Sequence, residues 1–426
     1  MSELNRRDFV VSGAVAAGAL VSMTAGGVHA QGSQAMKVGL IGCGGRGTGA
    51  AQNILEADPN VQIVALGDAF EGNVKGALAG LKRKDPKRVT ATEETAFHGL
   101  DAFEKVLKSD AELVILATPP GFRPYHLEAA INAGKHIFTE KPVAVDVTGI
   151  RKVLGLVAKA KEKNLAVVAG TQRRHQTGYL ETIKQLHDGA IGEITSARAY
   201  WNGNGIWFRD RRPGMTDAEY QLNNWYHFNW LCGDHIVEQH VHNLDVINWV
   251  LGTHPIKATG MGGRSNRKVG PAAEVGHIFD HFAVEFEYPN GVIVQSYCRQ
   301  IEGCANNISE SVVGTKGKCN VGGYVINNKY LLEGKNDNAP YVQEHIDLIK
   351  SIRAGKPLNE LENVATSTMT AILGRMTTYS GKTLEWDKVM KSATEDTFPK
   401  NLTLQSALPV SPIPVVGKTN FFGAAG

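Results

Sequence analysis

Cysteine is scarce in this sequence. Only 5 of the 426 residues are cysteine, and no two of them form a Cys-x-x-Cys pair. An odd and sparse set of thiols does not fit a disulfide scaffold or a structural zinc site. Stability must therefore come from a hydrophobic core. An apolar content of 42% provides for one, and the length allows about two or three domains.

Net charge and long apolar runs are also missing. The chain has 45 basic and 42 acidic residues, which leaves a formal charge of +3. This balance excludes a nucleic-acid protein that depends on a strong basic field. Beyond residue 30, no apolar run approaches the roughly 18 residues of a membrane span. With 20% charged residues, the composition is that of a folded globular chain.

The first thirty residues carry the pattern of an export signal. Arg6 and Arg7 precede Phe9 and a short apolar, small-residue run, and Val28-His29-Ala30 gives a small-x-small cleavage pattern. The arginine pair followed by Phe resembles a twin-arginine signal, and an ordinary secretory leader is the alternative. We therefore expect a periplasmic or otherwise exported protein, with the twin-arginine export machinery as a partner and no membrane span in the mature chain.

A glycine-rich loop follows the first apolar segment. Residues 36–41 predict a buried strand, and Gly-Cys-Gly-Gly-Arg-Gly at 42–47 has the G-x-G-x-x-G spacing. Residues 48–56 predict a helix, and 61–66 predict a second strand that runs on to Asp68. Strand, glycine loop, helix, strand and acid in this order indicate a dinucleotide-binding unit.

Individual residues of this unit have physical roles. Three glycines would provide the tight turn, the close backbone approach to a pyrophosphate and the close helix packing, in the order Gly42, Gly44 and Gly47. Asp68 is placed to accept a hydrogen bond from a ribose 2′-hydroxyl, which favours NAD over NADP. Arg46 and Lys75 are near enough in sequence to reach a 2′-phosphate, so NADP stays open.

Further strand and helix patterns alternate along the next hundred residues. Apolar strands are predicted at 112–117, 135–138 and 166–170, with helices at 125–133 and 147–163 between them. This alternation predicts an α/β Rossmann domain, a doubly wound parallel sheet. Ligands of such sheets bind at the carboxyl ends of the strands.

Two short motifs stand at those strand ends. They are Thr118-Pro119-Pro120 and Glu140-Lys141-Pro142. Together with the glycine loop they resemble the Gfo/Idh/MocA oxidoreductases, a family named after glucose–fructose oxidoreductase, inositol dehydrogenase and rhizopine catabolism proteins. The resemblance covers roughly residues 36–385. It implies an NAD(P)-dependent enzyme in which Lys141 contacts both the nicotinamide ribose and the substrate hydroxyl.

The cofactor contacts follow from the loop, the strand ends and the resemblance. The expected cofactor-binding residues are Gly42, Gly44, Arg46, Gly47, Asp68, Thr118, Pro119, His126, Glu140 and Lys141. An ammonium beside an alcohol lowers the cost of a developing alkoxide and can relay its proton. Lys141 is therefore also expected to be catalytic.

The pattern changes after residue 174. Alternating segments at 192–200 and 280–288 and a hairpin turn into 292–297 predict strands, and helices are expected near 341–354 and 360–379. We expect a C-terminal α+β domain with an open, mostly antiparallel sheet. The chain then divides into a signal at 1–30, a Rossmann domain at 36–174, a substrate and oligomerisation domain at 175–385, and an irregular tail at 386–426.

A cluster of polar residues lies at 234–245. As one helix, it would place four side chains on a common face, namely His235, Glu238, His242 and Asp245. The family pattern here is Asp-x-x-x-His-x-x-Asp, and this chain has Glu238 at the first position. The resemblance makes His242 the general base for the substrate hydroxyl, with Glu238 beside it.

Two other interpretations of this cluster stay open. His235, Glu238 and His242 could together bind a divalent ion, although the spacing does not match a zinc-peptidase motif. A polar helix face without chemistry is the second alternative. We expect acid–base chemistry and no metal.

Aromatic and basic residues near the cluster suit a carbohydrate. Indole rings stack on the C–H faces of sugars, and neighbouring polar groups bind hydroxyls. The residues expected to contact substrate are Arg173, Trp207, Trp225, His227, His235 and Asp245.

An exported dehydrogenase cannot rely on a free NAD pool. We therefore expect an oxidoreductase acting on a sugar, polyol or glycoside hydroxyl with a tightly retained cofactor. A redox-neutral NAD-dependent glycoside hydrolase or lyase of the same fold is the alternative, and a non-catalytic sugar-binding relative is a third. The resemblance also implies a homo-oligomer, a dimer or tetramer.

Overall fold

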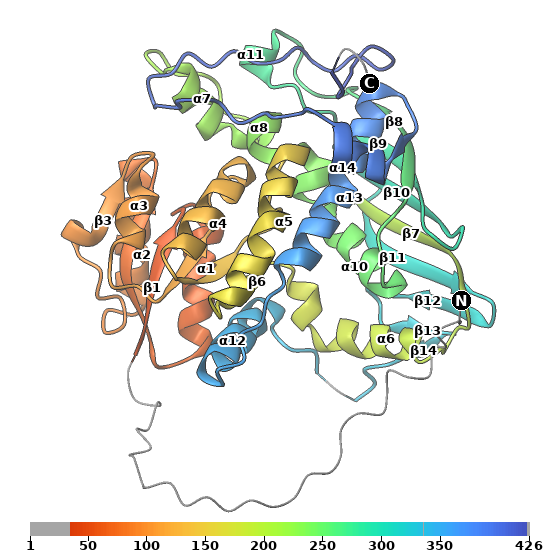
Figure 1. The fold of residues 1–426 in the computed structure, drawn as a ribbon, viewed down its shortest axis with the longest axis horizontal. Coiled ribbons are helices and arrows are strands. Elements are labelled where there is room, and N and C mark those ends of the chain that lie inside the picture. Colours follow the sequence, from red (N-terminus) through yellow and green to blue (C-terminus); the bar gives the residue numbers. More distant parts are fainter. Residues whose placement is uncertain (1–34, 335, 424–426) are drawn as a thin grey trace, which may run out of the picture. The chain divides into compact units, whose positions relative to one another are not determined.

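The computed structural model describes residues 35–334 and 336–423, and the expected export signal lies outside these ranges. The first domain is built on a six-stranded parallel sheet with strand order β3-β2-β1-β4-β5-β6. Its strands, in chain order, are β1 (Met36–Ile41), β2 (Val61–Asp68), β3 (Ala96–His98), β4 (Leu113–Leu116), β5 (His136–Thr139) and β6 (Val167–Ala169). This confirms the expected doubly wound Rossmann sheet (Figure 1).

Helices of this domain cover both faces of the sheet. They are α1 (Gly45–Ala57), α2 (Glu71–Lys84), α3 (Ala102–Leu107), α4 (Arg123–Asn132) and α5 (Val147–Glu162). In α5, Ile150, Val153 and Val157 are buried at the spacing of one helical face, and Asp146 caps the first turn by accepting from Gly149 N. β3 escaped sequence analysis because its three residues are partly exposed and form no apolar run.

The second domain contains a nine-stranded sheet with order β14-β13-β12-β11-β7-β10-β9-β8-β15. Its strands are β7 (Ile194–Gly203), β8 (Lys257–Gly263), β9 (His281–Glu287), β10 (Ile293–Gln300), β11 (Asn307–Gly314), β12 (Gly317–Asn320), β13 (Val325–Ile326), β14 (Lys329–Tyr330) and β15 (Leu384–Glu385). β7 and β10 pair in parallel, and the other pairs are antiparallel. Buried residues alternate along β10, so one face of the sheet packs on the core. The expected, mostly antiparallel sheet is confirmed.

The remaining helices connect the two domains and cover the second sheet. They are α6 (Thr177–His187), α7 (Asp217–Asn223), α8 (Asn229–Cys232), α9 (His235–Glu238), α10 (Val241–Leu251), α11 (Ala272–Val275), α12 (Pro340–Arg353), α13 (Leu361–Ser380) and α14 (Trp386–Ser392). α12 packs on α1, and α13 lies beside α5 while its other side contacts β8 (Figure 1). Both helices therefore return to the first domain.

The C-terminal tail differs from the expected irregular segment. It begins with a helix, α14, and only the residues beyond it lack regular structure. Thr397 N and Oγ1 donate to Asp146 Oδ2 at 2.7 and 2.6 Å, and Leu408 is buried against the α7–α8 region. The described part of the tail is thus held by its own chain.

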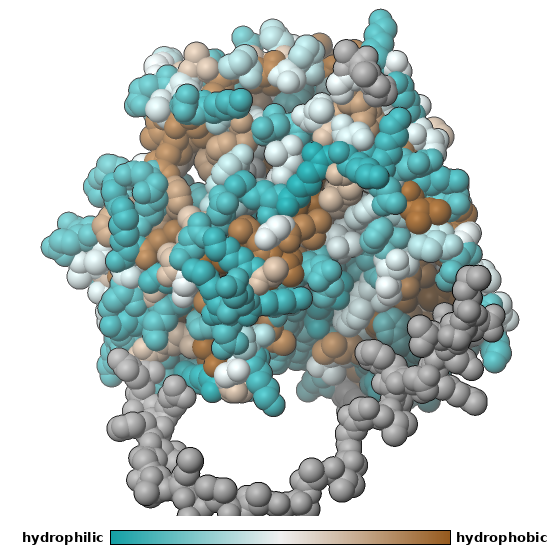
Figure 2. Space-filling view, viewed as in Figure 1, coloured by the Kyte–Doolittle hydropathy of each residue, from teal (hydrophilic) through white to brown (hydrophobic). Residues whose placement is uncertain are grey.

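The part of the chain that the structure describes contains no helix that could span a membrane. None of its helices combines the length and the apolar character needed to cross a bilayer. On the face seen in Figure 2, hydrophilic residues cover most of the surface, and hydrophobic ones form separate patches.

Several buried histidines make the fold sensitive to acid. Burial lowers the pKa of His240 to about 3 and that of His277 to about 4, from 6.5. Each is neutral in the folded chain and takes up a proton on unfolding below pH 6.5, so the free energy of unfolding should fall by about 1.4 kcal/mol per pH unit per histidine. Urea titrations at pH 7, 6 and 5 measure this loss, and equal stability at all three values would contradict it.

A substitution isolates one proton of this effect. His240→Asn removes one buried imidazole, so the slope of stability against pH between about 4 and 6.5 should decrease by about 1.4 kcal/mol per pH unit. His175 acts in the opposite sense. Burial lowers its pKa, but hydrogen bonds to Asp347 and Glu360 prevail and raise it to about 10. The stabilisation of the folded state by protonated His175 is fully present below pH 6.5 and is lost as the pH rises towards 10.

Candidate active site

One cavity of about 500 Å³ is lined by residues of both domains. The first domain contributes the glycine loop and the carboxyl ends of β2, β4 and β5. The second contributes β7, the 206–226 segment and the residues around α9 and α10. The predicted dinucleotide site and the predicted acid–base cluster therefore share a single cavity.

The glycine loop leaves room for a ligand where the sequence predicted it. Gly42 has a φ of +98°, and a Cβ at Gly47 would lie 1.8 Å from the Gly42 carbonyl oxygen. A Cβ at Gly44 or Gly45 would meet nothing within 4 Å. Because α1 begins at Gly45, its first N–H groups face this open space, which fits a pyrophosphate.

Asp68 is held firmly at the end of β2, where it lines the cavity. Its Oδ2 accepts from Cys43 N at 2.8 Å, and its Oδ1 accepts from Phe70 N at 2.9 Å and Asn73 Nδ2 at 3.0 Å. A carboxylate oxygen has two acceptor sites, so Oδ2 retains one for a ribose hydroxyl.

The two basic residues considered for a 2′-phosphate are engaged elsewhere. Lys75 lies 2.7 Å from Glu71 on the exposed side of α2. Arg46 lies 2.5 Å from Glu140 and 3.1 Å from Glu344 of α12. Because Lys75 and Arg46 are paired with glutamates, the surroundings of Asp68 fit NAD better than NADP.

The expected contacts at the end of β4 also line the cavity. These are Thr118, Pro119 and His126. Thr118 Oγ1 lies 3.1 Å from His126 Nδ1, and Arg123 Nη2 donates to Thr118 O at 2.5 Å. Burial, followed by the charge of Arg123, lowers the pKa of His126 to about 3. The imidazole is thus neutral and fixes the Thr118 hydroxyl.

Lys141 crosses from the first domain to the second. Its Nζ donates to Glu238 O at 2.6 Å and to Glu238 Oε1 at 3.1 Å. The two side chains are only 9% and 8% exposed, so the pair is shielded from solvent. Two of the three ammonium N–H groups are used, which leaves one for a ligand in the cavity. Glu238 Oε2 is buried without a hydrogen-bond partner and is available as an acceptor.

The single helix expected at 234–245 is wrong. The segment forms two helices, α9 ending at Glu238 and α10 beginning at Val241, with Gln239 and His240 between them. Asp234 begins the segment with a φ of +73°, outside helical geometry. Glu238 and His242 still both line the cavity, but the break also turns Gln239 into it.

His242 is a neutral base beside the lysine. Its ring stacks on Trp201 with centroids 5.8 Å apart. Burial, followed by the charges of Lys141, Arg173 and Arg46, lowers its pKa well below 6.5. The imidazole is therefore uncharged at neutral pH and can accept a proton from a hydroxyl.

Two residues of the expected face, His235 and Asp245, do not line the cavity. His235 is fully buried, with Nδ1 3.0 Å from Asp234 Oδ1. Asp245 pairs with Arg174 at 2.9 Å and accepts from Ser367 Oγ at 2.7 Å. Both side chains hold neighbouring residues in place, and their contact with substrate stays a prediction.

The remaining substrate residues divide in the same way. Trp207 and Trp225 line the cavity, as the sequence suggested. Arg173 instead forms an ion pair with the buried Glu310, and His227 Nε2 lies 2.7 Å from Trp207 O. These two residues hold their neighbours in place and do not line the cavity.

The alternative of a metal site receives no support. Across residues 35–334 and 336–423, no group of three or more His, Cys, Asp or Glu side chains is placed to hold a metal ion. In particular, His235, Glu238 and His242 do not form such a group.

Sequence analysis missed several residues of the site, among them Tyr341 and Glu344. Tyr341 lines the cavity from the start of α12, and Glu344 holds Arg46 from the next turn. Both lie about 300 residues from the glycine loop in sequence, as the 298-residue separation of Arg46 and Glu344 shows. No local motif marked them.

Comparison with protein families gives two adjoining matches. Residues 36–170 match the oxidoreductase family with an NAD-binding Rossmann fold, Gfo/Idh/MocA, and residues 179–320 match a Gfo/Idh/MocA C-terminal domain. Together the matches cover well over half of the chain.

Individual relatives are more distant. An inositol 2-dehydrogenase of Rhizobium meliloti (strain 1021) is 25% identical over 224 residues, which is 53% of this chain and 57% of the relative. A glycosyl hydrolase family 109 protein of Streptomyces coelicolor is 27% identical over 191 residues, covering 45% of this chain and 38% of the relative. The chain spans about half the length of the inositol dehydrogenases that it matches.

A solved structure supports the fold over a longer range. The scyllo-inositol dehydrogenase of Lactobacillus casei with bound NAD(H) and scyllo-inositol superimposes with a TM-score of 0.63 at 18% identity, covering 83% of this chain and all of that one. At this identity the likeness establishes the fold alone. With both family matches and the cavity they share, the chain belongs to the Gfo/Idh/MocA family of oxidoreductases, and its first domain is an NAD-binding Rossmann domain.

Proposed function

We propose that this protein is an NAD-dependent oxidoreductase that removes hydride from a CH–OH group of a polyol, sugar or glycoside. The observation that carries the proposal is the convergence of Lys141, Glu238 and His242 on the cavity that begins at the glycine loop. Inositol dehydrogenases among the relatives support an inositol-like polyol as the substrate class.

The side chains divide the work at the reacting hydroxyl. NAD, when bound, supplies the ring that accepts hydride from the carbinol carbon. The neutral imidazole of His242 takes the hydroxyl proton, and the free N–H of Lys141 stabilises the negative charge that develops on oxygen. Glu238 fixes the ammonium through its carbonyl and carboxylate oxygens.

A redox-neutral glycosidase is the second candidate. The family 109 glycosyl hydrolase among the relatives favours it, although the match covers only 38% of that protein. In this reaction, transient oxidation of a ring hydroxyl acidifies the neighbouring C–H, the glycosidic oxygen leaves, water adds, and the hydride returns to carbon. The same Lys141 and His242 would serve the oxidation and the final reduction.

Export and cofactor retention are part of the proposal. The Arg6-Arg7 pattern supports export by the twin-arginine machinery, and an exported enzyme needs a nucleotide that stays bound. We also propose a homodimer or tetramer. Exposed hydrophobic residues on the second sheet, Met261, Ile308 and Val313, support self-association. Light scattering of the purified protein measures the oligomeric state.

The deciding experiment has two parts. The exported mature protein is denatured, and any released nucleotide is identified by chromatography, with about one NAD(H) per chain expected. The native protein is then assayed with myo-inositol, scyllo-inositol and D-glucose, and with 4-nitrophenyl glycosides without an added acceptor. Polyol-dependent reduction of NAD supports the oxidoreductase, and release of nitrophenol supports the glycosidase. If neither activity is detected and no nucleotide is bound, both candidate functions are overturned.

Asp68 gives a test of nucleotide choice. Asp68→Asn removes the charge that favours a ribose 2′-hydroxyl and repels a 2′-phosphate, so the preference for NAD over NADP should fall roughly tenfold. Protein incubated with equimolar NAD and NADP is washed, and the bound nucleotides are quantified. Asp85→Asn, whose carboxylate pairs with Arg88 outside the cavity, is the matched control. An unchanged ratio in Asp68→Asn would show that this carboxylate does not select the nucleotide.

A further inference from the structure

A tyrosine in the cavity wall has no place in the acid–base set. Tyr226 lines the cavity but is only 2% exposed. It packs with Cys232 and Ile278, and its ring lies 5.2 Å from that of Trp225. A phenol in this position adds a polar group beside the apolar side chains of Leu222 and Trp225.

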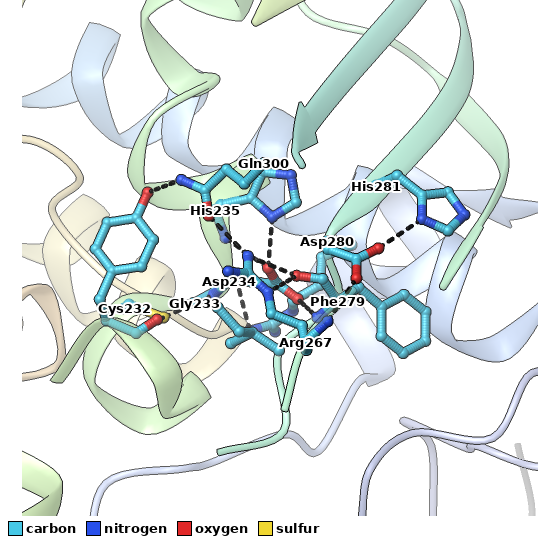
Figure 3. A network of polar contacts seen from close by, with 12 residues as sticks. Cys232, Gly233, Asp234, His235, Arg267, Phe279, Asp280, His281 and Gln300 are labelled. Atoms are coloured by element: carbon cyan, nitrogen blue, oxygen red, sulfur yellow. Dashed lines mark hydrogen bonds and ion pairs between the residues drawn. The ribbon is translucent and has the colours of Figure 1, made fainter. Parts of the chain in front are cut away.

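The hydrogen bonds behind Tyr226 run in one direction. Arg267 Nη2 donates to Gln300 Oε1 at 2.7 Å (Figure 3). Gln300 Nε2 in turn donates to the Tyr226 hydroxyl at 2.9 Å. A guanidinium can only donate, so the amide must direct its oxygen to Arg267 and its NH₂ to Tyr226. The Tyr226 oxygen is therefore an acceptor in this chain, and its own proton points elsewhere.

Arg267, at the end of this hydrogen-bond series away from Tyr226, is itself held by backbone and carboxylate groups. Arg267 Nε and Nη2 donate to Phe279 O at 3.2 and 3.0 Å, and Asp280 Oδ2 accepts from Arg267 N at 3.2 Å. Gln300 N donates to Asp280 O at 2.8 Å. These contacts come from three separate segments, so the orientation of the amide is built into the fold (Figure 3).

The Tyr226 proton has no acceptor among the described residues. No described side chain or carbonyl receives a hydrogen bond from this hydroxyl, and leaving a buried donor unpaired costs about 1–3 kcal/mol. The space that Tyr226 lines is the cavity. Burial, followed by the charge of Glu238, raises the pKa of Tyr226 well above 10, so the hydroxyl keeps its proton.

We propose that Tyr226 binds the substrate, donating a hydrogen bond from its hydroxyl to an oxygen of the polyol or sugar, and that Gln300 and Arg267 aim this proton. The inference rests on the proposed function and adds to it. Besides Lys141 and His242, the cavity then offers substrate hydroxyls a fixed donor in Tyr226 and a free acceptor in Glu238 Oε2. A ligand rich in hydroxyl groups satisfies both.

Two variants test the direction of the proton. Tyr226→Phe deletes the donor at constant shape, and we expect KM for the most active compound of the polyol and glycoside panel to rise about tenfold with kcat nearly unchanged. Gln300→Glu keeps an acceptor for Arg267 but presents only acceptors to Tyr226, which should turn the proton away from the cavity. It should raise KM as much as Tyr226→Phe, and the double variant should show no further rise.

Controls separate this role from a structural one. Tyr288→Phe removes another buried hydroxyl, which donates to Asn248 Oδ1 at 2.6 Å outside the cavity, and should leave KM unchanged. Bound NAD per chain should be equal in the parent and in all four variants. An unchanged KM in Tyr226→Phe, or additive effects in the double variant, overturns the inference.

A crystal structure of the NAD-loaded protein tests the inference without a substrate. It should show an ordered water or ligand oxygen in the cavity within hydrogen-bond distance of the Tyr226 hydroxyl. A hydroxyl that donates to Glu238 or to another protein acceptor overturns the inference. Failure here differs from failure of the proposed function, which would appear as full turnover in a Lys141 variant.

Discussion

Lys141→Met should lower turnover at least about a hundredfold while the protein still binds NAD. The substitution keeps the length of the side chain but removes the ammonium, which lies 2.6 Å from Glu238 O and 3.1 Å from Glu238 Oε1. Without it, no positive charge meets the oxygen as the hydride leaves, and loss of such a group typically costs a factor of 10² to 10⁴. Turnover is measured as the steady-state rate with the most active compound of the polyol and glycoside panel. NAD binding is measured as the nucleotide content after denaturation.

Lys135→Met is the matched control for this variant. Lys135 lies just before β5, and its Nζ donates to Ser109 O and Ala111 O, outside the cavity. Its loss removes one lysine from the same strand region but should leave turnover within about twofold of the parent. Near-normal turnover in Lys141→Met would remove this lysine from the reaction and with it the carrying observation of the proposal.

The expected site residues that line the cavity include several whose placement depends on local sequence. A glycine loop between a strand and a helix fixes its own geometry, because a Cβ at Gly47 would collide with the Gly42 carbonyl 1.8 Å away. Asp68 and Lys141 follow strands, and parallel strands place their carboxyl ends along one edge of the sheet. Spacing and strand order were therefore sufficient to place them at the cavity.

The segment at 234–245 shows where local reasoning fails. Its residues have helical spacing, but Asp234 is held by groups far away in sequence, since Oδ2 accepts from Phe279 N at 2.7 Å and from the Tyr379 hydroxyl. These contacts fix a positive φ at Asp234 and accompany the break after Glu238. A periodicity argument cannot include partners about 45 and 145 residues away, as the separations of these two bonds show.

The same limit applies to the residues contributed by the last third of the chain. Tyr341 and Glu344 reach the glycine loop because α12 returns to pack on α1. The sequence predicted this helix, but not which of its side chains would face Arg46. The sequence of a helix indicates which of its faces is buried, whereas tertiary packing decides which element that face contacts.

His242→Ala should also lower turnover at least about a hundredfold, because the other neutral imidazole that lines the cavity, that of His126, is engaged with the Thr118 hydroxyl. Burial and the charges of Lys141, Arg173 and Arg46 hold its pKa well below 6.5. The parent rate should consequently show no inflection near pH 6.5, where an ordinary histidine base would become protonated and inactive. Rates measured from pH 5 to 9 at saturating substrate give this profile.

The control is an exposed histidine that is outside the cavity. His98→Ala should leave both the rate and its pH dependence unchanged. A parent profile that falls below pH 6.5 and persists in His98→Ala would contradict the neutral assignment of His242. Normal turnover in His242→Ala would remove it as the base.

The double variant Lys141→Met/His242→Ala shows whether the two residues act on the same atom. Groups that serve one proton transfer form a unit, and removing the second then costs much less than removing it alone. If both side chains act on the same substrate hydroxyl, the double variant should be only slightly slower than the slower single variant. Fully multiplicative losses would instead mean that the two residues contribute independently to the transition state and do not act as one unit on the same hydroxyl.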